Sequence, residues 1–140
     1  MFRRILIAHD GSEGAKKALV AAIDLAKRCQ AELHSISVEE HLPLYAAGFA
    51  SPKKAEEQES QYFLAVTQEA RDMARKQGVA LHTHILPGHE VDTIVRFARE
   101  HQIDLLVIGF MGHSRVMDRI WGSTSQSLAQ QSPCQVLVIK

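Results

Sequence analysis

The sequence has few features that would cross-link the chain or anchor it in a membrane. Its two cysteines, Cys29 and Cys134, form no Cys-x-x-Cys motif, so we expect two buried free thiols in a reducing compartment. Every apolar run is shorter than the roughly 18–20 residues of a membrane-spanning helix. The apolar stretch at the amino terminus ends at His9-Asp10, too early for the core of a secretion signal. These absences predict a cytoplasmic protein without a membrane anchor.

An excess of charge of either sign is also lacking. The chain has 16 basic and 16 acidic residues, whereas proteins that coat nucleic acid normally carry a basic excess. We therefore expect no nucleic-acid partner. With 140 residues, 46% of them hydrophobic, the chain is long enough for one packed core and too short for two ordinary domains. The sequence predicts one domain over residues 1–140.

Strand-like and helix-like segments alternate along the chain. Short apolar segments predict five strands, at Ile5–Ala8, Leu33–Val38, Val79–Leu86, Leu105–Ile108 and Gln135–Ile139. Helical spacing of apolar residues predicts four helices, at Ala15–Cys29, between Pro52 and Gly78, at Val91–Ala98 and at about Ser125–Gln131. Ser12 is the expected N-cap of the first helix. Residues 40–51 follow no regular period and are expected to form one long loop, which includes Leu42–Ser51.

This alternation predicts an α/β fold built from parallel β-α-β units with right-handed crossovers. We expect a single doubly wound five-stranded parallel sheet, in the order 3-2-1-4-5, with helices on both faces. Sheets of this kind bind ligands beyond the carboxyl ends of their strands, where the winding direction reverses. In this order the reversal lies between the first and fourth strands. The loops that follow these strands, His9–Ser12 and Gly109–Gly122, are therefore the predicted site.

The second of these loops carries the most specific motif of the chain. Gly109-Phe110-Met111-Gly112 is followed, after nine residues, by Gly122-Ser123-Thr124-Ser125, where hydroxyls and unpaired amides would open the last helix. The positive end of the helix dipole at that point suits phosphates. His113, Arg115 and Arg119 lie between the two segments and could add positive charge. The alternative is an ordinary glycine turn followed by a Ser/Thr cap.

Asp10 ends the first strand, where a carboxylate can accept hydrogen bonds from ribose hydroxyls or hold a magnesium-bound water. The alternative is a turn-forming Asp in Asp-Gly. Other enzyme classes lack their residues in this sequence: the glycine loop has no Walker A lysine, no Gly-x-Gly-x-x-Gly follows the first strand, and no Gly-x-Ser-x-Gly elbow is present. The eight histidines include no pair at i, i+4, so we expect no zinc site.

With these residues, the sequence resembles the universal stress protein family over essentially the whole chain. The matching segments are the opening Ile5–Ser12, the strand around Val38 and the strand Leu105–Gly109. The most specific match is Gly109-x2-Gly112-x9-Gly122-Ser123, the motif of the ATP-binding branch of that family. The resemblance thus implies the same α/β fold and an adenine-nucleotide site.

By this resemblance, Asp10 would contact the ribose, the backbone of Val38 would meet the adenine, and Gly109 would lie beside the ribose. The phosphates would be held by Gly112, His113, Gly122, Ser123 and Thr124. The implied nucleotide-binding set also includes Ala8, Ser12, Ile108, Met111 and Ser125. One departure is Ala8, which stands where many relatives have proline.

The resemblance also implies a cofactor and partners. The cofactor would be ATP, with Mg²⁺ on its phosphates and Asp10 as a candidate metal contact. We expect a homodimer joined through the last strand, because Gln135–Ile139 is apolar and lies at a sheet edge in the predicted order. The nucleotide would act as a state marker in the stress response that a protein partner reads. The alternatives are a dimeric interaction module that needs no nucleotide and a slow ATP hydrolase; Asp10 is the only candidate general base.

Overall fold

The computed structural model describes residues 1–40, 52–110 and 122–140 of the chain. In these ranges strands and helices alternate. They are β1 (Arg4–Ala8), α1 (Glu13–Cys29), β2 (Glu32–Glu39), α2 (Pro52–Lys76), β3 (Leu81–Pro87), α3 (Glu90–Glu100), β4 (Leu105–Gly109), α4 (Ser123–Gln131) and β5 (Gln135–Ile139). The loop expected at Leu42–Ser51 lies outside the described residues, as does most of the loop between β4 and α4.

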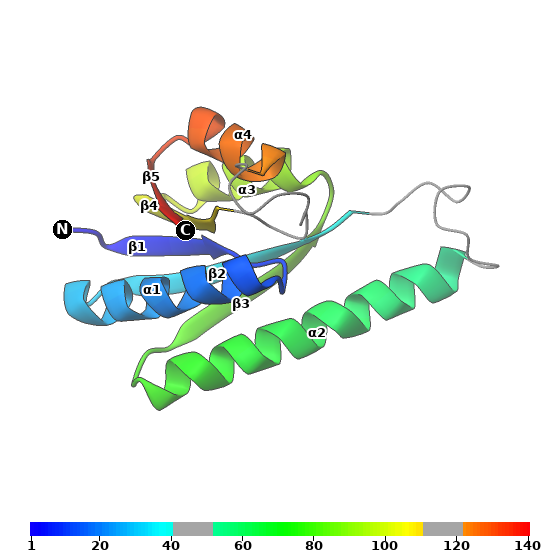
Figure 1. The fold of residues 1–140 in the computed structure, drawn as a ribbon, viewed down its shortest axis with the longest axis horizontal. Helices are drawn as coiled ribbons and strands as arrows, with labels where there is room; N and C mark the ends of the chain where they lie inside the picture. The colour runs from blue at the N-terminus through cyan, green and yellow to red at the C-terminus, as the bar shows by residue number, and fades with distance from the viewer. Residues whose placement is uncertain (41–51, 111–121) are drawn as a thin grey trace.

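The five strands form one parallel sheet in the order β3-β2-β1-β4-β5. This order confirms the predicted doubly wound architecture. Figure 1 shows α1 and α2 on one face of the sheet and α3 and α4 on the other. Each connection between consecutive strands of the chain contains a helix. This helix returns the chain to the end of the sheet where the previous strand began, so all strands run parallel.

The hydrophobic core has two parts, one on each face of the sheet. Alternate residues of the central strands face opposite sides. Ile5, Ile7 and Val107 pack with α1 and the carboxyl-terminal half of α2, whereas Leu6 and Leu106 pack with α3 and α4. These five side chains are fully buried, and each such burial contributes roughly 1.5–3 kcal/mol to stability. The core therefore fixes β1 and β4 side by side at the centre of the sheet.

The helix boundaries follow their capping residues. Ser12 is the N-cap of α1 and accepts a hydrogen bond from the Ala15 amide at 3.2 Å, as predicted. Gly78, with φ +75°, follows the end of α2, where a left-handed residue is needed. The last helix begins at Ser123, two residues before the expected start, because Gly122 is its N-cap.

The cysteines and the exposed side chains complete the description of the fold. Cys29 and Cys134 are free, as predicted, but they are half-buried rather than buried. Tyr62 of α2 is 42% exposed. Among the residues that the structure describes, no helix is both long and apolar enough to cross a membrane.

Candidate functional site

The turn between β1 and α1 is held by backbone and side-chain hydrogen bonds. The His9 amide donates to the Ile36 carbonyl at 2.9 Å, and the Ser37 hydroxyl donates to the His9 carbonyl at 2.7 Å. The Asp10 carboxylate accepts from the Ser12 amide at 2.9 Å, which is an Asx turn. These bonds fix the half-buried Asp10 side chain at the carboxyl end of β1.

Tyr62 of α2 completes this turn, and sequence reasoning missed its contact. Its hydroxyl donates to the Asp10 carbonyl at 2.8 Å, and its ring lies over Gly11. A Cβ on Gly11 would meet the Tyr62 hydroxyl oxygen and the Val66 side chain at 2.9 Å or less. Gly11 also has φ +83°, so only glycine suits this position. The Asp10-Gly11 pair signals the turn in the sequence, but nothing in the sequence pairs it with Tyr62.

Burial shifts the titration of two groups around this turn. His9 is only 4% exposed, and burial lowers the pKa of its imidazole. Its Nδ1 accepts a hydrogen bond from the Gly11 amide at 3.3 Å, which requires a neutral ring with the proton on Nε2. Burial, followed by the nearby Asp10 charge, raises the pKa of the Tyr62 hydroxyl. His9 and Tyr62 are therefore neutral near pH 7.

Gly109 lies where β4 ends beneath the start of α1. A Cβ at this position would come within 2.9 Å of the Gly14 carbonyl carbon and oxygen, closer than such atoms approach. The absence of a side chain therefore lets α1 pack on β4. The atoms that a Cβ on Gly109 would meet belong to the backbone of α1, and the expected place of Gly109 beside a ribose stays a prediction.

The start of α4 lies next to the end of β4. The Gly122 amide donates to the Phe110 carbonyl at 3.1 Å, and the Ser125 hydroxyl donates to the Gly109 carbonyl at 2.7 Å. Gly122 is the N-cap, with φ −60° and no side-chain cap. Glycine has no side chain that could accept hydrogen bonds from the first amides of α4. These amides lie at the positive end of the helix dipole.

The predicted residues divide into three groups by place. Those at the carboxyl edge of the central strands or at the adjoining helix starts are Ala8, Asp10, Ser12, Ile108, Gly109, Gly122, Ser123, Thr124 and Ser125. Val38 is at the same edge, near the end of β2 and paired with Leu86 of β3. Met111, Gly112 and His113 lie outside the described residues. The hydroxyls of Ser12 and Ser125 already hold α1 and α4 in place, while Ser123 is exposed and Thr124 is half-buried.

The chemistry of this edge is that of an anion or polyol site. Asp10 supplies a carboxylate, which accepts hydrogen bonds from hydroxyls, and the start of α4 supplies amides and the hydroxyls of Ser123 and Thr124. In the ranges 1–40, 52–110 and 122–140, no group of three or more His, Cys, Asp or Glu side chains is arranged to hold a metal ion.

Comparison with known proteins decides the family. The sequence model described as "Universal stress protein family" matches residues 1–140. The chain belongs to the universal stress protein family. It is 30% identical over 148 residues to the universal stress protein YxiE of Bacillus subtilis, covering all of both chains.

Solved structures of the family have the same fold. A structure of a family member from Burkholderia pseudomallei has a TM-score of 0.80 at 27% identity. The match covers 99% of this chain and 96% of that chain. A universal stress protein in complex with cAMP has a TM-score of 0.72 at 26% identity, with 97% of that chain and 99% of this one covered. The family match agrees with the observed sheet order.

Proposed function

We propose that this universal stress protein binds ATP at the carboxyl edge of β1 and β4 and regulates a partner according to the bound nucleotide. The observation that carries the proposal is the juxtaposition of the Asp10 turn with the start of α4. The first can accept hydrogen bonds from a ribose, and the second can attract phosphates. The complex of a family member with cAMP supports an adenine nucleotide as the ligand class.

Each described residue has a distinct part in this proposal. Asp10 accepts hydrogen bonds from the ribose hydroxyls, and the backbone of Val38 at the end of β2 meets the adenine. The amides and hydroxyls of Ser123 and Thr124 bind phosphate oxygens. Met111, Gly112 and His113 complete the phosphate loop. Ile108, Gly109 and Ser125 shape the floor of the site, since the last two hold β4 against α1 and α4.

Magnesium suits the oxygen donors of this site. Mg²⁺ prefers oxygen ligands and usually binds through one or two protein groups together with substrate phosphates. The described residues offer the Asp10 carboxylate and the Ser123 and Thr124 hydroxyls rather than a cage of carboxylates. Bound Mg²⁺ would neutralise phosphate charge, with Asp10 as the candidate protein contact.

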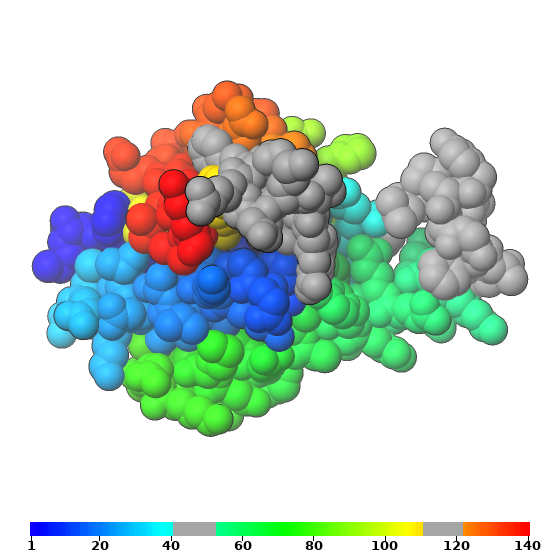
Figure 2. All heavy atoms as spheres, in the orientation of Figure 1, coloured from blue at the N-terminus to red at the C-terminus, as the bar shows by residue number. Residues whose placement is uncertain are grey.

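We also propose that the protein forms a homodimer and is located in the cytoplasm. The last strand, β5, pairs with β4 on one side only in the described sheet, and its apolar residues Val136–Ile139 are half-buried. Figure 2 shows the last residues, in red, at the surface beside α1. An antiparallel contact with a second β5 would satisfy the open edge around a two-fold axis. The free cysteines suit a reducing compartment.

Calorimetric titration with ATP, ADP, AMP and GTP, each with and without Mg²⁺, tests the nucleotide proposal. We expect ATP to bind more tightly than GTP and to bind more tightly with Mg²⁺. Measurement of released phosphate in the same samples tests slow hydrolysis. If none of the four nucleotides binds, the protein is an interaction module that keeps the fold without a nucleotide, and the proposal is wrong.

A further inference from the structure

Histidines from two strands and a helix end gather on the face of the sheet covered by α3. His34 of β2 lies in register with His82 of β3, and His84 follows His82 on the same face. The ring centroid of His34 is 4.9 Å from that of His82 and 5.3 Å from that of His84. His101, just after α3, lies 6.1 Å from His84 by the same measure. The cluster is independent of the proposed nucleotide function.

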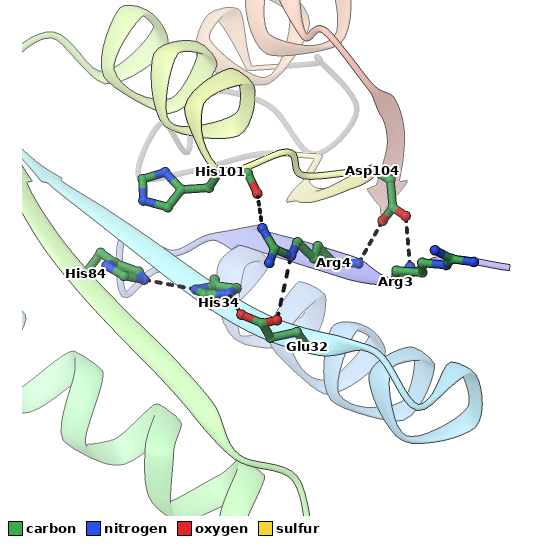
Figure 3. Close-up of polar contacts among 7 residues, drawn as sticks. All are labelled: Arg3, Arg4, Glu32, His34, His84, His101 and Asp104. Carbon is green, nitrogen blue, oxygen red and sulfur yellow. Dashed lines mark hydrogen bonds and ion pairs between the residues drawn. The ribbon is translucent and has the colours of Figure 1, made fainter.

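Hydrogen bonds join part of this cluster into a chain. His34 Nε2 lies 2.8 Å from Glu32 Oε1, and His34 Nδ1 lies 3.0 Å from His84 Nε2. Glu32 also pairs with Arg4 of β1, whose Nε is 3.6 Å away. Figure 3 shows this chain of contacts running from His84 through His34 and Glu32 to Arg4. One side-chain hydrogen bond, between His34 and His84, thus links β2 to β3.

The carboxylate of Glu32 determines where the protons lie. An ionised carboxylate only accepts hydrogen bonds, so His34 Nε2 carries a proton. A neutral His34 then has a bare Nδ1, which accepts from a proton on His84 Nε2. If His34 gains a proton, its Nδ1 donates instead, and His84 must present a bare Nε2. The two rings can therefore share one added proton but not two, because two N–H donors would then face each other across 3.0 Å.

We propose that Glu32, His34 and His84 form an acid-sensitive contact that fastens β3 and α3 to β2 while at most one of the two imidazoles is charged. When both are charged, the hydrogen bond is lost and like charges replace it. β3 is an edge strand, with β2 as its one neighbour in the described sheet. The edge strand and the helix that covers it are therefore the parts expected to loosen first.

The surroundings of the pair oppose a second charge. His34 is 9% exposed, and the Phe97 ring of α3 lies 4.7 Å from the His84 ring. The titratable and charged groups that face the pair are Glu32 on β2, Arg4 on β1, His82 on β3 and His101 at the end of α3. Of these, Glu32 alone favours the charged form of the imidazoles. It does so for His34, with which it is hydrogen-bonded.

The direction of the pH effect follows from burial. Burial lowers the pKa of both His34 and His84 below 6.5, and Glu32 only partly offsets this for His34. The unfolded chain therefore binds more protons than the folded chain as the pH falls below about 6.5, the unperturbed value. The stabilisation is present above that pH and is lost as the pH falls toward the folded-state pKa values.

Denaturant unfolding between pH 7.5 and 5.5 tests the contact. His84→Gln keeps a side-chain amide that can donate to His34 Nδ1 but cannot gain a proton. His89→Gln is the matched control, because His89 is an exposed histidine at the start of α3 whose side chain makes no cap bond. For each proton taken up on unfolding, the ratio of folded to unfolded protein falls about tenfold per pH unit. Between pH 7.5 and pH 5.5, we expect the ratio of folded to unfolded protein to fall about tenfold further in the parent and in His89→Gln than in His84→Gln.

Two measurements on the parent protein keep the inference testable if a variant fails to fold. Hydrogen exchange, corrected for the intrinsic pH dependence, should show β3 and α3 opening more at pH 5.5 than at pH 7.5, relative to β1. Nitrogen-15 spectra of the histidine rings at pH 7.5 should show a bare Nδ1 on His34. Equal pH dependence in His84→Gln and the parent, unchanged opening of β3, or a protonated Nδ1 on His34 would each overturn the proposal.

Discussion

At the residue scale, the two described glycines of the motif have different surroundings. Gly109 touches the first turn of α1, where a Cβ would lie 2.9 Å from backbone atoms of Gly14. Gly122 has an ordinary φ of −60° and caps α4. A substitution at Gly109 therefore disturbs packing, whereas a substitution at Gly122 changes the space in front of the helix start.

We expect Gly109→Ala to lower the free energy of unfolding by about 1–3 kcal/mol, the usual cost of overpacking. The backbone of α1 must move away from β4 to admit the methyl group. Denaturant unfolding at pH 7.5 measures this, with Ser123→Ala at an exposed position as the control. If Gly109→Ala is as stable as the parent, the close contact with Gly14 does not constrain the residue.

Gly122→Val is expected to weaken ATP binding by about a hundredfold or more while leaving the fold nearly intact. A β-branched side chain would block the approach of phosphates to the start of α4. The lost charge-assisted hydrogen bonds are worth roughly 1.5–3 kcal/mol each, and every 1.4 kcal/mol is about a tenfold change in affinity. Gly122 has φ −60°, which valine adopts without strain, so the expected effect comes from the added side chain and not from a change of the backbone.

Calorimetric ATP affinity and the melting temperature without nucleotide separate these two effects of Gly122→Val. Ser123→Ala is the milder comparison, since it removes one hydroxyl and keeps the backbone amide. Parent-like ATP binding by Gly122→Val would mean that the start of α4 does not hold the phosphates.

At the element scale, one hydrogen bond identifies the residue of β5 whose backbone groups face the open edge of the sheet. The Phe110 amide donates to the Ile139 carbonyl at 2.9 Å, so the backbone groups of Ile139 face β4. Because successive residues of a strand point their backbone groups in opposite directions, those of Val138 face the open edge. Val138 is therefore the residue whose amide is available to a second β5.

We expect Val138→Pro to convert a dimer into a monomer. Proline removes the outward amide and leaves the hydrogen bonds of Ile139 to β4 in place. Val138→Thr keeps the amide and nearly the same shape, so it should remain dimeric. Sedimentation at micromolar concentration measures all three proteins. A monomeric parent protein would contradict the dimer itself.

The sequence predicted the elements of the fold better than the contacts between them. The apolar periods located all five strands, because each strand buries a regular pattern of side chains, and the alternation of strands with helices predicted the doubly wound order of the sheet. Sequence reasoning missed the histidine cluster, in which His34 lies beside His82 and is hydrogen-bonded to His84. Strand alternation puts His82 and His84 on one face, but only the pairing register of β2 with β3 brings His34 to them.

The same limit applies to the candidate site. Asp10 and Ser12 follow from the strand-to-helix turn, since the signals are local in the sequence. Tyr62 is 52 positions from Asp10, and its contact depends on the direction in which α2 crosses the face of the sheet. The packing of Gly109 against the backbone of α1 was also missed, because a sequence does not indicate which atoms fill the space next to a glycine.

At the scale of the whole molecule, three histidines connect stability to pH. His9, His34 and His84 each have a pKa lowered mainly by burial. Two of them belong to the acid-sensitive contact, and His9 lies in the β1–α1 turn. The residual pH dependence of a His84→Gln variant should therefore include a contribution from His9.

Unfolding at pH 6 should take up about one to two protons, because the unfolded histidines titrate near 6.5 and the buried ones lie lower. Thermal unfolding by calorimetry in buffers of different ionisation enthalpy measures this uptake. At pH 8 the histidines are neutral in both states, and the uptake from them should vanish. Equal enthalpies in all buffers at pH 6 would contradict the prediction.

The Asp104 carboxylate, which accepts from the amides of Arg3 and Arg4 at 2.8 and 2.9 Å, ties the two central strands together across 101 positions of the chain. On a ribosome, this distance in the sequence delays the pairing of β1 with β4. At roughly 5–20 residues per second, about 5–20 seconds pass between the synthesis of β1 and that of β4. During this interval β2 is the one strand that can pair with β1, and Ile5, Leu6 and Ile7 lie along an edge that the finished sheet buries completely. The nascent chain is therefore most in need of protection from aggregation before residue 109 emerges.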